Sequence, residues 1–465
     1  MPINSNVNVA NYQTLEYQKF VEIYNDSRFP PITAIYSDYY SGTQIEVFNK
    51  YAVLTFDIGQ NAALGPANTL PFGDNAASDA FGRLRISLPD TIINIKQTVD
   101  NAPLLFSQAE VGTGDIYYDP NNASSMLSVS ADGDVAVRQT KQYFNYQPGK
   151  SQLVFSTFCM QNVSNTISRV GLFDSSTTSP YSASLEGFYL QNNGGTISLH
   201  ISNTGGQASQ SATQANWNID KMNGTGLSGI TLDFTKTQIL AIDFEWLGVG
   251  RVRFGFVING IVFYVHQFVH ANNISLPYLK NPNKPLRWEI RSSGGIAALR
   301  QICGTVMSEG GAQTNGRPFG VNTGPASIGN ISDGVACPLI TLRLKESYKS
   351  STVSLKDFGS MAFSTTNSIL TVISNGVLTS SASFVEMPNS AVEYSIATSS
   401  TSISGGTVLF TVYFNKASGT LSNITESLFT IGSNVDGTKD FISICATPCG
   451  GNEKYFGSAN WLEFL

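Results

Sequence analysis

Hydrophobic and polar positions alternate along residues 239–268, and this two-residue period predicts three antiparallel β-strands joined by two turns. Asn259-Gly260 separates two of these strands, and a two-residue type I′ turn requires the positive φ angles that Asn and Gly adopt most readily. We expect the apolar face of this hairpin to lie in the core, and the opposite face, which carries Arg251, Arg253 and His266, to be half exposed. The turn also sets four facing pairs: Ile258 with Ile261, Phe256 with Phe263, Phe254 with Val265, and Val252 with Gln267.

The strand before this hairpin carries two carboxylates, Asp243 and Glu245, that alternate with apolar residues. They lie beside Arg251 and Arg253 if the glycine loop around residues 248–250 has three or five residues. Paired carboxylates can catalyse glycoside hydrolysis. Here each acid has a nearby arginine, so we expect cross-strand ion pairs on a solvated sheet face, each worth about 0.2–1 kcal/mol.

Short strand patterns recur from residue 79 to residue 347, with glycine, asparagine and serine between them. A helical period is almost absent, so this region is predicted to be a β-sandwich or jelly roll. Residues 312–338 are rich in glycine and lack a hydrophobic period, and we interpret them as a long loop or an interdomain passage. Apart from the three strands already described, the predicted strands are Arg83–Leu88, Gln139–Tyr146, Ser151–Cys159, Ile167–Phe173, Leu185–Gln191, Thr196–Ile201 and Leu286–Ser292.

The two ends of the chain differ from this central region. Residues 1–50 are polar and rich in tyrosine, with too few aliphatic residues to fold alone, so residues 1–78 are predicted to be an N-terminal arm and linker. Ser/Thr-rich strands after residue 347 predict a smaller C-terminal β-sandwich. These strands are Ile369–Ser374, joined by Asn375-Gly376 to Val377–Thr379, and then Thr407–Asn415 and Phe441–Cys445. The predicted fold class is therefore all-β and multi-domain, with an arm (1–78), a central jelly-roll β-sandwich (79–347) and a C-terminal β-sandwich (348–465).

The composition and the net charge limit the classes of partner that we expect for this chain. The chain has 465 residues, enough for two or three domains that each bury a core. Charged residues make up 13% of the chain, the net charge is −6, and the basic residues form no run, which argues against direct contact with nucleic acid. The first residues lack the pattern of a signal peptide and no run of 18 apolar residues occurs, so we expect synthesis in the cytoplasm and no membrane partner.

Residue types that catalyse reactions or bind metals are few in this chain. The cysteines number five, and Cys445 and Cys449 form the one close pair, so we expect buried thiols and neither disulfides nor zinc. His266 and His270 have the spacing of zinc ligands on a helix, but residues four apart on a strand lie about 13 Å apart. No nucleophile elbow or phosphate-binding glycine loop occurs. The sequence therefore predicts a protein that is not an enzyme, with no catalytic residue, metal site or cofactor.

Four segments resemble one group of known proteins. They are residues 79–87 (DAFGRLRIS), 137–151 (VRQTKQYFNYQPGKS), 244–255 (FEWLGVGRVRFG) and 284–290 (KPLRWEI). In these segments the chain resembles virion structural proteins of large double-stranded DNA viruses, chiefly tailed bacteriophages, over roughly residues 79–345. The central region is also similar to concanavalin-like sandwiches, at residues 170–173, 187–190 and the strands that follow. The resemblance implies a virion protein and supplies no site residues.

We therefore expect a structural component of a viral particle, in the capsid, neck or tail, that is made in the host cytoplasm and contacts copies of itself and other virion proteins. Apolar residues at both ends of the chain are the candidate assembly contacts: Tyr12, Tyr17, Tyr24, Tyr36, Tyr39, Tyr40, Trp461 and Phe464. The tyrosines can equally cap the arm itself, and the terminal NWLEFL can dock on its own domain. The alternative is a tail-borne adhesin whose sandwich binds host glycans. Tyr181, Tyr189 or Trp217 near loops would support it as an aromatic platform, but the sequence favours a core or rim position for each of them.

Overall fold

The computed structural model describes residues 33–35, 46–48, 79–80, 89–311, 316–364, 366–379, 382–398, 400–414, 420–423 and 430–464. The chain forms two compact units, Met1–Leu70 and Pro71–Leu465. In the first unit the described elements are β1 (Thr33–Ile35) and β2 (Glu46–Phe48), which pair antiparallel. All further description concerns the second unit.

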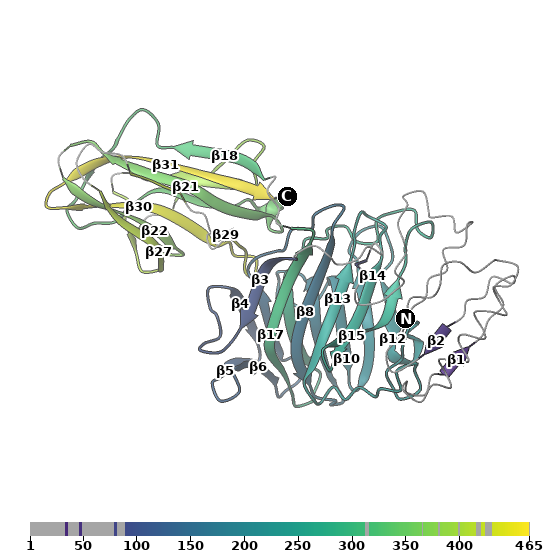
Figure 1. Cartoon of the computed structure of the whole chain (residues 1–465). Helices are drawn as coiled ribbons and strands as arrows, with labels where there is room; N and C mark the ends of the chain where they lie inside the picture. Colours follow the sequence, from purple (N-terminus) through teal and green to yellow (C-terminus); the bar gives the residue numbers. More distant parts are fainter. Residues whose placement is uncertain are drawn as a thin grey trace, which may run out of the picture. The chain divides into compact units, whose positions relative to one another are not determined.

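Two large antiparallel sheets pack face to face in the first half of this unit (Figure 1). The seven-stranded sheet has the order β12 (Gln210–Thr213), β11 (Thr196–Ser202), β10 (Glu186–Asn193), β9 (Thr166–Asp174), β16 (Leu286–Ser292), β7 (Val135–Thr140) and β4 (Phe106–Val111). The eight-stranded sheet has the order β15 (Ile261–Phe268), β14 (Val252–Ile258), β13 (Gln238–Phe244), β8 (Ser151–Met160), β17 (Ala297–Glu309), β6 (Ser124–Val129) and β5 (Asp115–Asp119), with β3 (Asp90–Lys96) also pairing β17.

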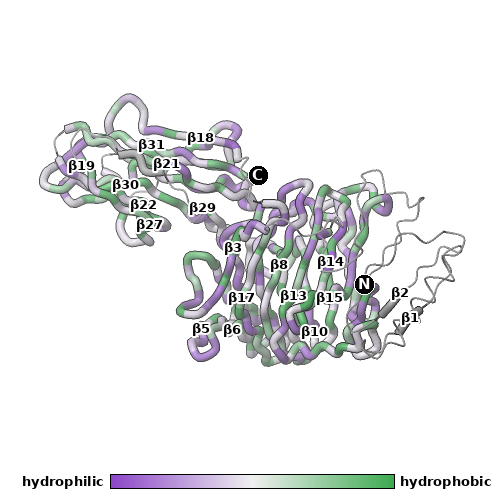
Figure 2. Tube along the Cα trace, in the orientation of Figure 1, coloured by the Kyte–Doolittle hydropathy of each residue, from purple (hydrophilic) through white to green (hydrophobic). Residues whose placement is uncertain are grey.

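The core of this sandwich consists of every second side chain of both sheets, as the two-residue period requires. Trp288, Phe188 and Phe244 are fully buried in it, and the rings of Phe188 and Phe244 meet at 4.6 Å between centroids. The alternation is visible in the hydropathy along the strands (Figure 2). Burying a large apolar side chain contributes about 1.5–3 kcal/mol, so this layer is the main stabilising element of the sandwich.

A second pair of sheets follows, with its own apolar core that includes Trp461, Tyr455 and Phe358. One sheet has the order β18 (Arg317–Asn322), β31 (Glu453–Phe464), β21 (Thr352–Ala362) and β28 (Thr420–Asn423), and β19 (Ile328–Ile331) and β29 (Thr430–Ile431) pair β31 and β21. The other has the order β24 (Val385–Glu386), β25 (Val392–Ile396), β20 (Cys337–Leu344), β30 (Phe441–Cys449), β22 (Asn367–Ser374) and β27 (Thr407–Phe414).

This architecture confirms the predicted fold class: the described chain is all-β, with a central two-sheet sandwich and a smaller sandwich after it. Within the predicted arm, residues 1–78, the described residues are those of β1 and β2, and the rest lies outside the described part of the chain. Strands β18, β19 and β20 belong to the second pair of sheets, so that pair begins earlier in the chain than residue 348. No helix in the described part of the chain is long and apolar enough to cross a membrane.

The hairpin at Asn259-Gly260 confirms the predicted turn but only part of the predicted register. Both turn residues have positive φ, 52° and 81°. Ile258 pairs with Ile261 and Phe256 with Phe263, as predicted. A β-bulge between residues 254 and 255 then shifts the partners by one residue, and the remaining predictions were wrong because a bulge adds a residue to one strand. The observed pairs beyond it are Phe254 with His266 and Val252 with Phe268.

The second Asn-Gly pair does not close a hairpin. Asn375 has a positive φ of 53°, whereas Gly376 is absent from the positive-φ residues of the described chain. Strand β22, before the pair, is bonded to β27 and β30, and β23 (Val377–Leu378), after it, is bonded to β26 (Ile403–Ser404). The predicted hairpin was therefore wrong, and these two residues carry the chain out of one sheet into a small separate one.

Two further expectations are corrected, and one strand was not predicted. The strand expected at Gln139–Tyr146 is β7, Val135–Thr140, which lies earlier in the chain. Residues 312–338 are not a structureless passage, since they contain β18 and β19, both paired with β31. The central strand β17 was missed because its inward positions include Gln301 and Gly304 and a bulge near Ile302 interrupts its period.

Candidate functional site

Polar side chains form two rows across the outer face of the seven-stranded sheet, the face opposite the core. The cross-strand pairs place one residue of each strand in each row. The first row, in the order from β12 to β4, is Ser211, His200, Tyr189, Gly171, Arg287, Gln139 and Ser107. The second row, in the same order, is Thr213, Ser198, Gln191, Arg169, Glu289, Val137 and Ala109. We call them the first and second polar rows.

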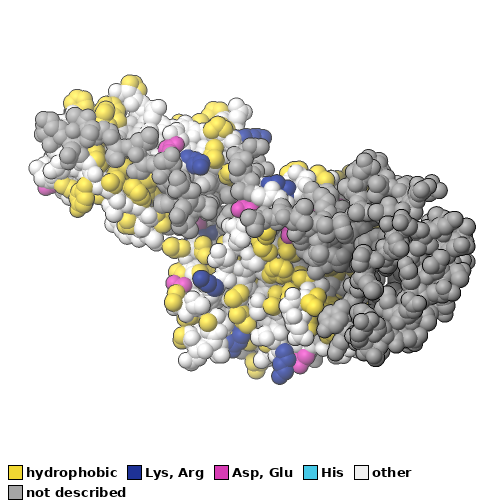
Figure 3. Space-filling model, in the orientation of Figure 1, with side chains coloured by type: hydrophobic (Ala, Val, Ile, Leu, Met, Phe, Trp, Pro, Cys, Tyr) yellow, Lys and Arg dark blue, Asp and Glu magenta, His cyan; other side chains and the backbone are white. Residues whose placement is uncertain are grey.

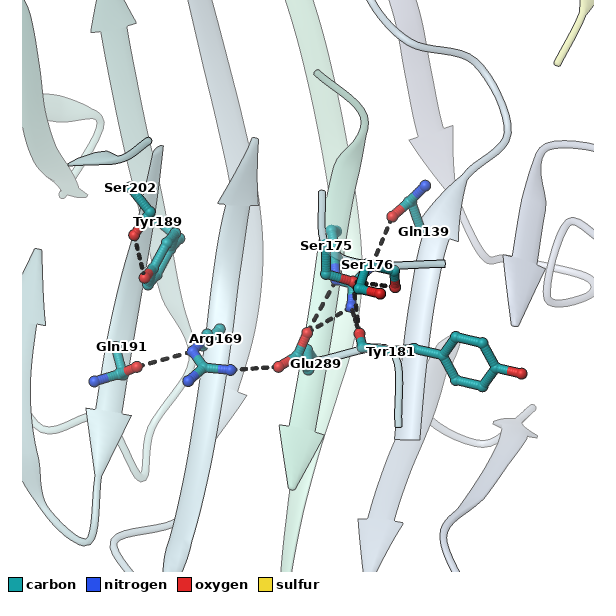
Figure 4. A network of polar contacts seen from close by, with 10 residues as sticks. Gln139, Arg169, Ser175, Ser176, Tyr181, Tyr189, Gln191, Ser202 and Glu289 are labelled. Carbon is teal, nitrogen blue, oxygen red and sulfur yellow. Dashed lines mark hydrogen bonds and ion pairs between the residues drawn. The ribbon is translucent and has the colours of Figure 1, made fainter. Parts of the chain in front are cut away.

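Three buried charges hold the centre of the rows together (Figure 4). Glu289 lies between Arg169, which donates to its Oε1, and Arg287, whose Nη2 lies 2.6 Å from its Oε2. Burial opposes the ionisation of Glu289, but the two guanidinium groups outweigh it and lower the pKa of this carboxyl. Glu289 is therefore a fixed anion that positions two arginines.

Two amides continue this network along both sides. Arg169 donates through Nε to Gln191 Oε1 at 2.8 Å, and Arg287 donates through Nη1 to Gln139 Oε1 at 2.8 Å. Because an arginine can only donate, each amide must turn its oxygen to the arginine and its NH₂ group away. The orientation of both amides is thus set by their neighbours.

Tyr189 and His200 form the next part of the first row. Their rings stack with centroids 4.9 Å apart, and the Tyr189 hydroxyl lies 2.7 Å from Ser202 Oγ. His200 Nε2 lies 2.8 Å from Ser198 Oγ. Burial, with a contribution from Arg169, lowers the pKa of His200 to about 4, so the imidazole is neutral at pH 7. This end of the rows is polar but uncharged.

The segment between β9 and β10 covers the centre of the rows. The Tyr181 carbonyl accepts from Arg287 Nη2 and from Ser175 Oγ, the latter at 2.7 Å, as Figure 4 shows. Gln139, Arg287 and Glu289 are accordingly buried. The accessible part is the β10–β12 end, where Gln191, His200 and Ser202 are half-buried, and Ser211 and Thr213 are exposed.

The carboxylate and arginine pairs predicted on the eight-stranded sheet are present in part. Asp243 and Arg253 are direct cross-strand partners and form an ion pair, and the Tyr264 hydroxyl donates to Asp243 Oδ2 at 2.8 Å. The backbone N–H of Glu245 donates to the carbonyl of Arg251, and five residues lie between the two. Five is one of the two loop lengths that the prediction required. The expected solvation was wrong: Asp243 and Arg253 are both fully buried, and Ala80 lies against this face, accepting from Arg251.

The predicted aromatic platforms are not exposed surfaces. Tyr189 and Trp217 are buried, the latter in the core against Phe256, and Tyr181 is half-buried over the polar rows. Tyr189 and Trp217 are therefore core or rim aromatics, which is the position that the sequence favoured for them. The alternation of residues along a strand does not show whether another segment of the chain covers that strand. Nothing in the sequence indicated that these side chains would be covered.

The candidate assembly contacts lie in two places. Tyr12, Tyr17, Tyr24, Tyr36, Tyr39 and Tyr40 lie outside the described residues. Trp461 is 1% exposed in the core of its own sandwich and donates to Glu463, so the expectation that it contacts another subunit was wrong. Phe464 is half-buried at the end of β31. The C-terminal segment docks on its own domain because β31 is a central strand between β18 and β21.

Histidines and cysteines lie apart from one another. His266 accepts through Nδ1 from the backbone N–H of Asn218, and His270 Nδ1 contacts the Gly250 carbonyl. Within the described residues, no three His, Cys, Asp or Glu side chains gather as metal ligands. All five cysteines are free thiols: Cys337 and Cys445 are buried as expected, whereas Cys303 is exposed.

Comparison with known proteins finds similarity to solved structures but not to sequences, and the similarity to the structures is distant. No family model matches the chain, and no curated protein matches it. The carbohydrate recognition domain of Emp47p has 10% identity and a TM-score of 0.30, covering 46% of this chain and 93% of its own. The legume lectin-like domain from Entamoeba histolytica has 11% identity and a TM-score of 0.30, covering 47% and 98%.

A Bacillus licheniformis β-glucanase is similar to the same degree, with 9% identity and a TM-score of 0.29, covering 47% of this chain and 99% of its own. These names describe those proteins. They assign no site and no activity to this chain.

Proposed function

We propose that this protein is a non-catalytic carbohydrate-binding protein and that it holds a neutral sugar on the β10–β12 end of the polar rows. The observation that supports this is the set of half-buried groups there: the Gln191 amide, the His200 imidazole and the Ser202 hydroxyl lie on adjacent strands of one sheet. Sugar hydroxyls donate and accept at once, and they match a surface of oriented neutral donors and acceptors.

The buried centre of the rows supports this role by holding the accessible groups in place. Gln191 is oriented by Arg169, which is in turn fixed by Glu289. A side chain that is already held in its binding orientation loses less conformational entropy when the ligand arrives. The described geometry thus supports a pre-organised recognition surface.

The same centre argues against catalysis of glycoside hydrolysis. A general acid needs a raised pKa, whereas two arginines lower the pKa of Glu289. Asp243, on the other sheet, is bound by Arg253 and Tyr264. The resemblance of four segments to virion proteins supports the finer proposal that the sugar belongs to a host glycan and the protein to a viral particle.

A glycan array probed with the full-length protein tests the proposal, followed by calorimetric titration of the best neutral oligosaccharide. We expect Gln191→Ala and His200→Ala each to weaken binding about tenfold or more, because each removes hydrogen bonds to the sugar. Gln267→Ala is the matched control, since Gln267 is a half-buried amide on β15 of the other sheet. An array without any bound glycan would contradict the function, and equal binding by all three variants would contradict the site.

A second candidate function is the structural role in a particle, and one edge strand favours it. Strand β27 is the last described strand of its sheet, and its Val408 and Tyr413 side chains are 58% and 76% exposed. Figure 3 shows hydrophobic side chains at this edge of the second sandwich. An open apolar edge is a surface on which a strand of another chain can pair. Light scattering of the wild type and of Tyr413→Lys tests it: a monomer in both would contradict self-association through β27.

A further inference from the structure

A group of polar side chains lies buried on the other side of the seven-stranded sheet, between the two sheets of the first sandwich. Arg138 on β7 points inward, because it is the cross-strand partner of the core residue Trp288 on β16. Its guanidinium lies 3.9 Å from the centroid of the Phe106 ring, and Phe106 also contacts Trp288. Arg138 and Trp288 are both fully buried.

The eight-stranded sheet contributes amides to the same place. Arg138 Nε donates to Gln301 Oε1 at 2.6 Å, which joins the two sheets through a hydrogen bond. Gln301 on β17 is the cross-strand partner of Ser125 on β6, and Ser125 Oγ lies 2.6 Å from Gln97 Oε1. Gln301 and Ser125 are fully buried, and Gln97 is 1% exposed. We call Arg138, Trp288, Gln301 and Gln97 the interior donor cluster.

Each member of this cluster retains an N–H group that has no hydrogen-bond partner among the described residues. These groups are Arg138 Nη1, Trp288 Nε1, Gln301 Nε2 and Gln97 Nε2. Arginine and indole can only donate, and Gln301 must keep its oxygen toward Arg138, so three of the four are donors in any arrangement. Gln97 can present either amide atom, because the Ser125 hydroxyl can donate or accept.

The cluster also lacks a counter-charge. Among the described residues no carboxylate lies within ion-pair distance of Arg138, and its Nη2 donates to the Asn101 carbonyl instead. Asp100, an exposed residue nearby, attracts it from a distance, while burial lowers the pKa of Arg138 to about 9, so it is a cation at pH 7. An unpaired buried cation is unstable unless an anion accompanies it.

We propose that the interior donor cluster binds a small monovalent inorganic anion of the halide type between the sheets. An anion accepts from several N–H groups at once and neutralises Arg138. A water molecule fits less well, because it leaves Arg138 without a counter-charge and because the side-chain oxygens of the cluster, Gln301 Oε1 and Gln97 Oε1, already have one partner each. Strand β8 carries two buried side-chain oxygens without a partner among the described residues: Gln152 Oε1, whose cross-strand partner is Ser308, and Ser156 Oγ, whose cross-strand partner is Gly304.

Chloride and bromide are the probes for the full-length protein. At constant ionic strength, exchanging gluconate for chloride is expected to raise the melting temperature by about 3–5 °C for each tenfold increase above the dissociation constant. Crystals soaked in bromide are expected to show an anomalous peak beside Arg138 Nη1, Gln301 Nε2 and Trp288 Nε1. Trp288→Phe removes one donor with little loss of volume and is expected to weaken the chloride effect about tenfold.

Arg300→Met is the control, because Arg300 lies next to Gln301 on β17 but faces outward, paired with Asp119. It should keep the full chloride effect. The proposal is overturned if bromide peaks occur only at the surface, or if chloride and gluconate give the same melting temperature. These measurements are independent of the sugar site, which lies on the opposite face of the sheet.

Discussion

Buried charges in the first sandwich differ in how they are compensated. The carboxylate of Glu289 forms ion pairs with two buried arginines, whereas the ion pair of Arg300 and Asp119 is partly exposed to solvent. A buried charge that loses its partner keeps its desolvation penalty, while a solvated pair gains little from forming. The same chemical change is therefore expected to have different effects at these two places.

Glu289→Gln should lower the free energy of unfolding by about 3–5 kcal/mol, because Arg169 and Arg287 would remain buried without their anion. Asp119→Asn, the matched change at the partly exposed pair, should lower the free energy of unfolding by less than about 1 kcal/mol. Urea unfolding of the two variants at pH 7 measures both. Equal losses in the two variants would contradict the distinction drawn from burial.

Two histidines link stability to pH. Burial lowers the pKa of His266 to about 4, and burial with Arg169 does the same for His200, against about 6.5 in the unfolded chain. Between these values the unfolded chain binds more protons than the folded one, so stability is complete above pH 6.5 and falls as the pH decreases toward 4. Each histidine contributes a slope of at most about 1.4 kcal/mol per pH unit.

Urea midpoints measured between pH 7 and pH 5 are expected to fall for the wild type and to fall less for His266→Gln. This window lies above the range in which ordinary carboxylates titrate, so the difference reports on the histidine. A variant with the same pH dependence as the wild type would show that His266 titrates normally in the folded protein.

At the scale of elements, the two Asn-Gly pairs show what a local signal can establish. Asn259-Gly260 lies between strands with a strict two-residue period, and the turn that the dipeptide favours is the one that forms. Asn375-Gly376 has the same residues, but the strand before it already has two neighbours in its sheet. At Asn375-Gly376 the pairing of β22 with strands far away in the sequence determines the chain path. A local sequence pattern does not contain information on such pairing.

Gly260→Ala should lower the free energy of unfolding by about 1 kcal/mol, because the φ of 81° disfavours any side chain even though nothing lies near the added Cβ. Gly329→Ala on β19 is the control: it has equal space and no positive φ, and should change stability by less than about 0.5 kcal/mol. Thermal or urea unfolding of both proteins provides the comparison. An equal effect of the two changes would mean that φ is not the cause.

The candidate site was harder to predict than the fold for a related reason. The hydrophobic period that predicts β13, β14 and β15 lies within about 30 consecutive residues. The contact between Arg169 and Glu289, in contrast, joins residues that are 120 positions apart in the sequence. Neighbours in the polar rows come from strands in the order β10, β9, β16 and β7, which no short pattern encodes. The same holds for Arg138 and Gln301, polar residues whose inward direction follows only from the register of their strands.

At the scale of the whole molecule, strand order decides which fragments can fold. β20 lies in the middle of its sheet, between β25 and β30, and β18 and β19 both pair with β31. A fragment of residues 317–465 keeps all three, and we expect it to give dispersed amide resonances and a cooperative urea transition. A fragment of residues 348–465 loses them and should be unfolded. A folded 348–465 fragment would contradict this assignment of strands.

Strand β17 also has a consequence for the synthesis of the chain. It fills the gap between β8 and β6, yet it is translated roughly 140 residues after β8 ends. At about 5–20 residues per second, the ribosome needs roughly 7–30 s to supply it. During that time β8 and β6 each have an unpaired edge, and neighbouring nascent chains on one messenger can pair with it. Slow translation of residues 161–296 should therefore increase aggregation before release, long before any property of the finished protein matters.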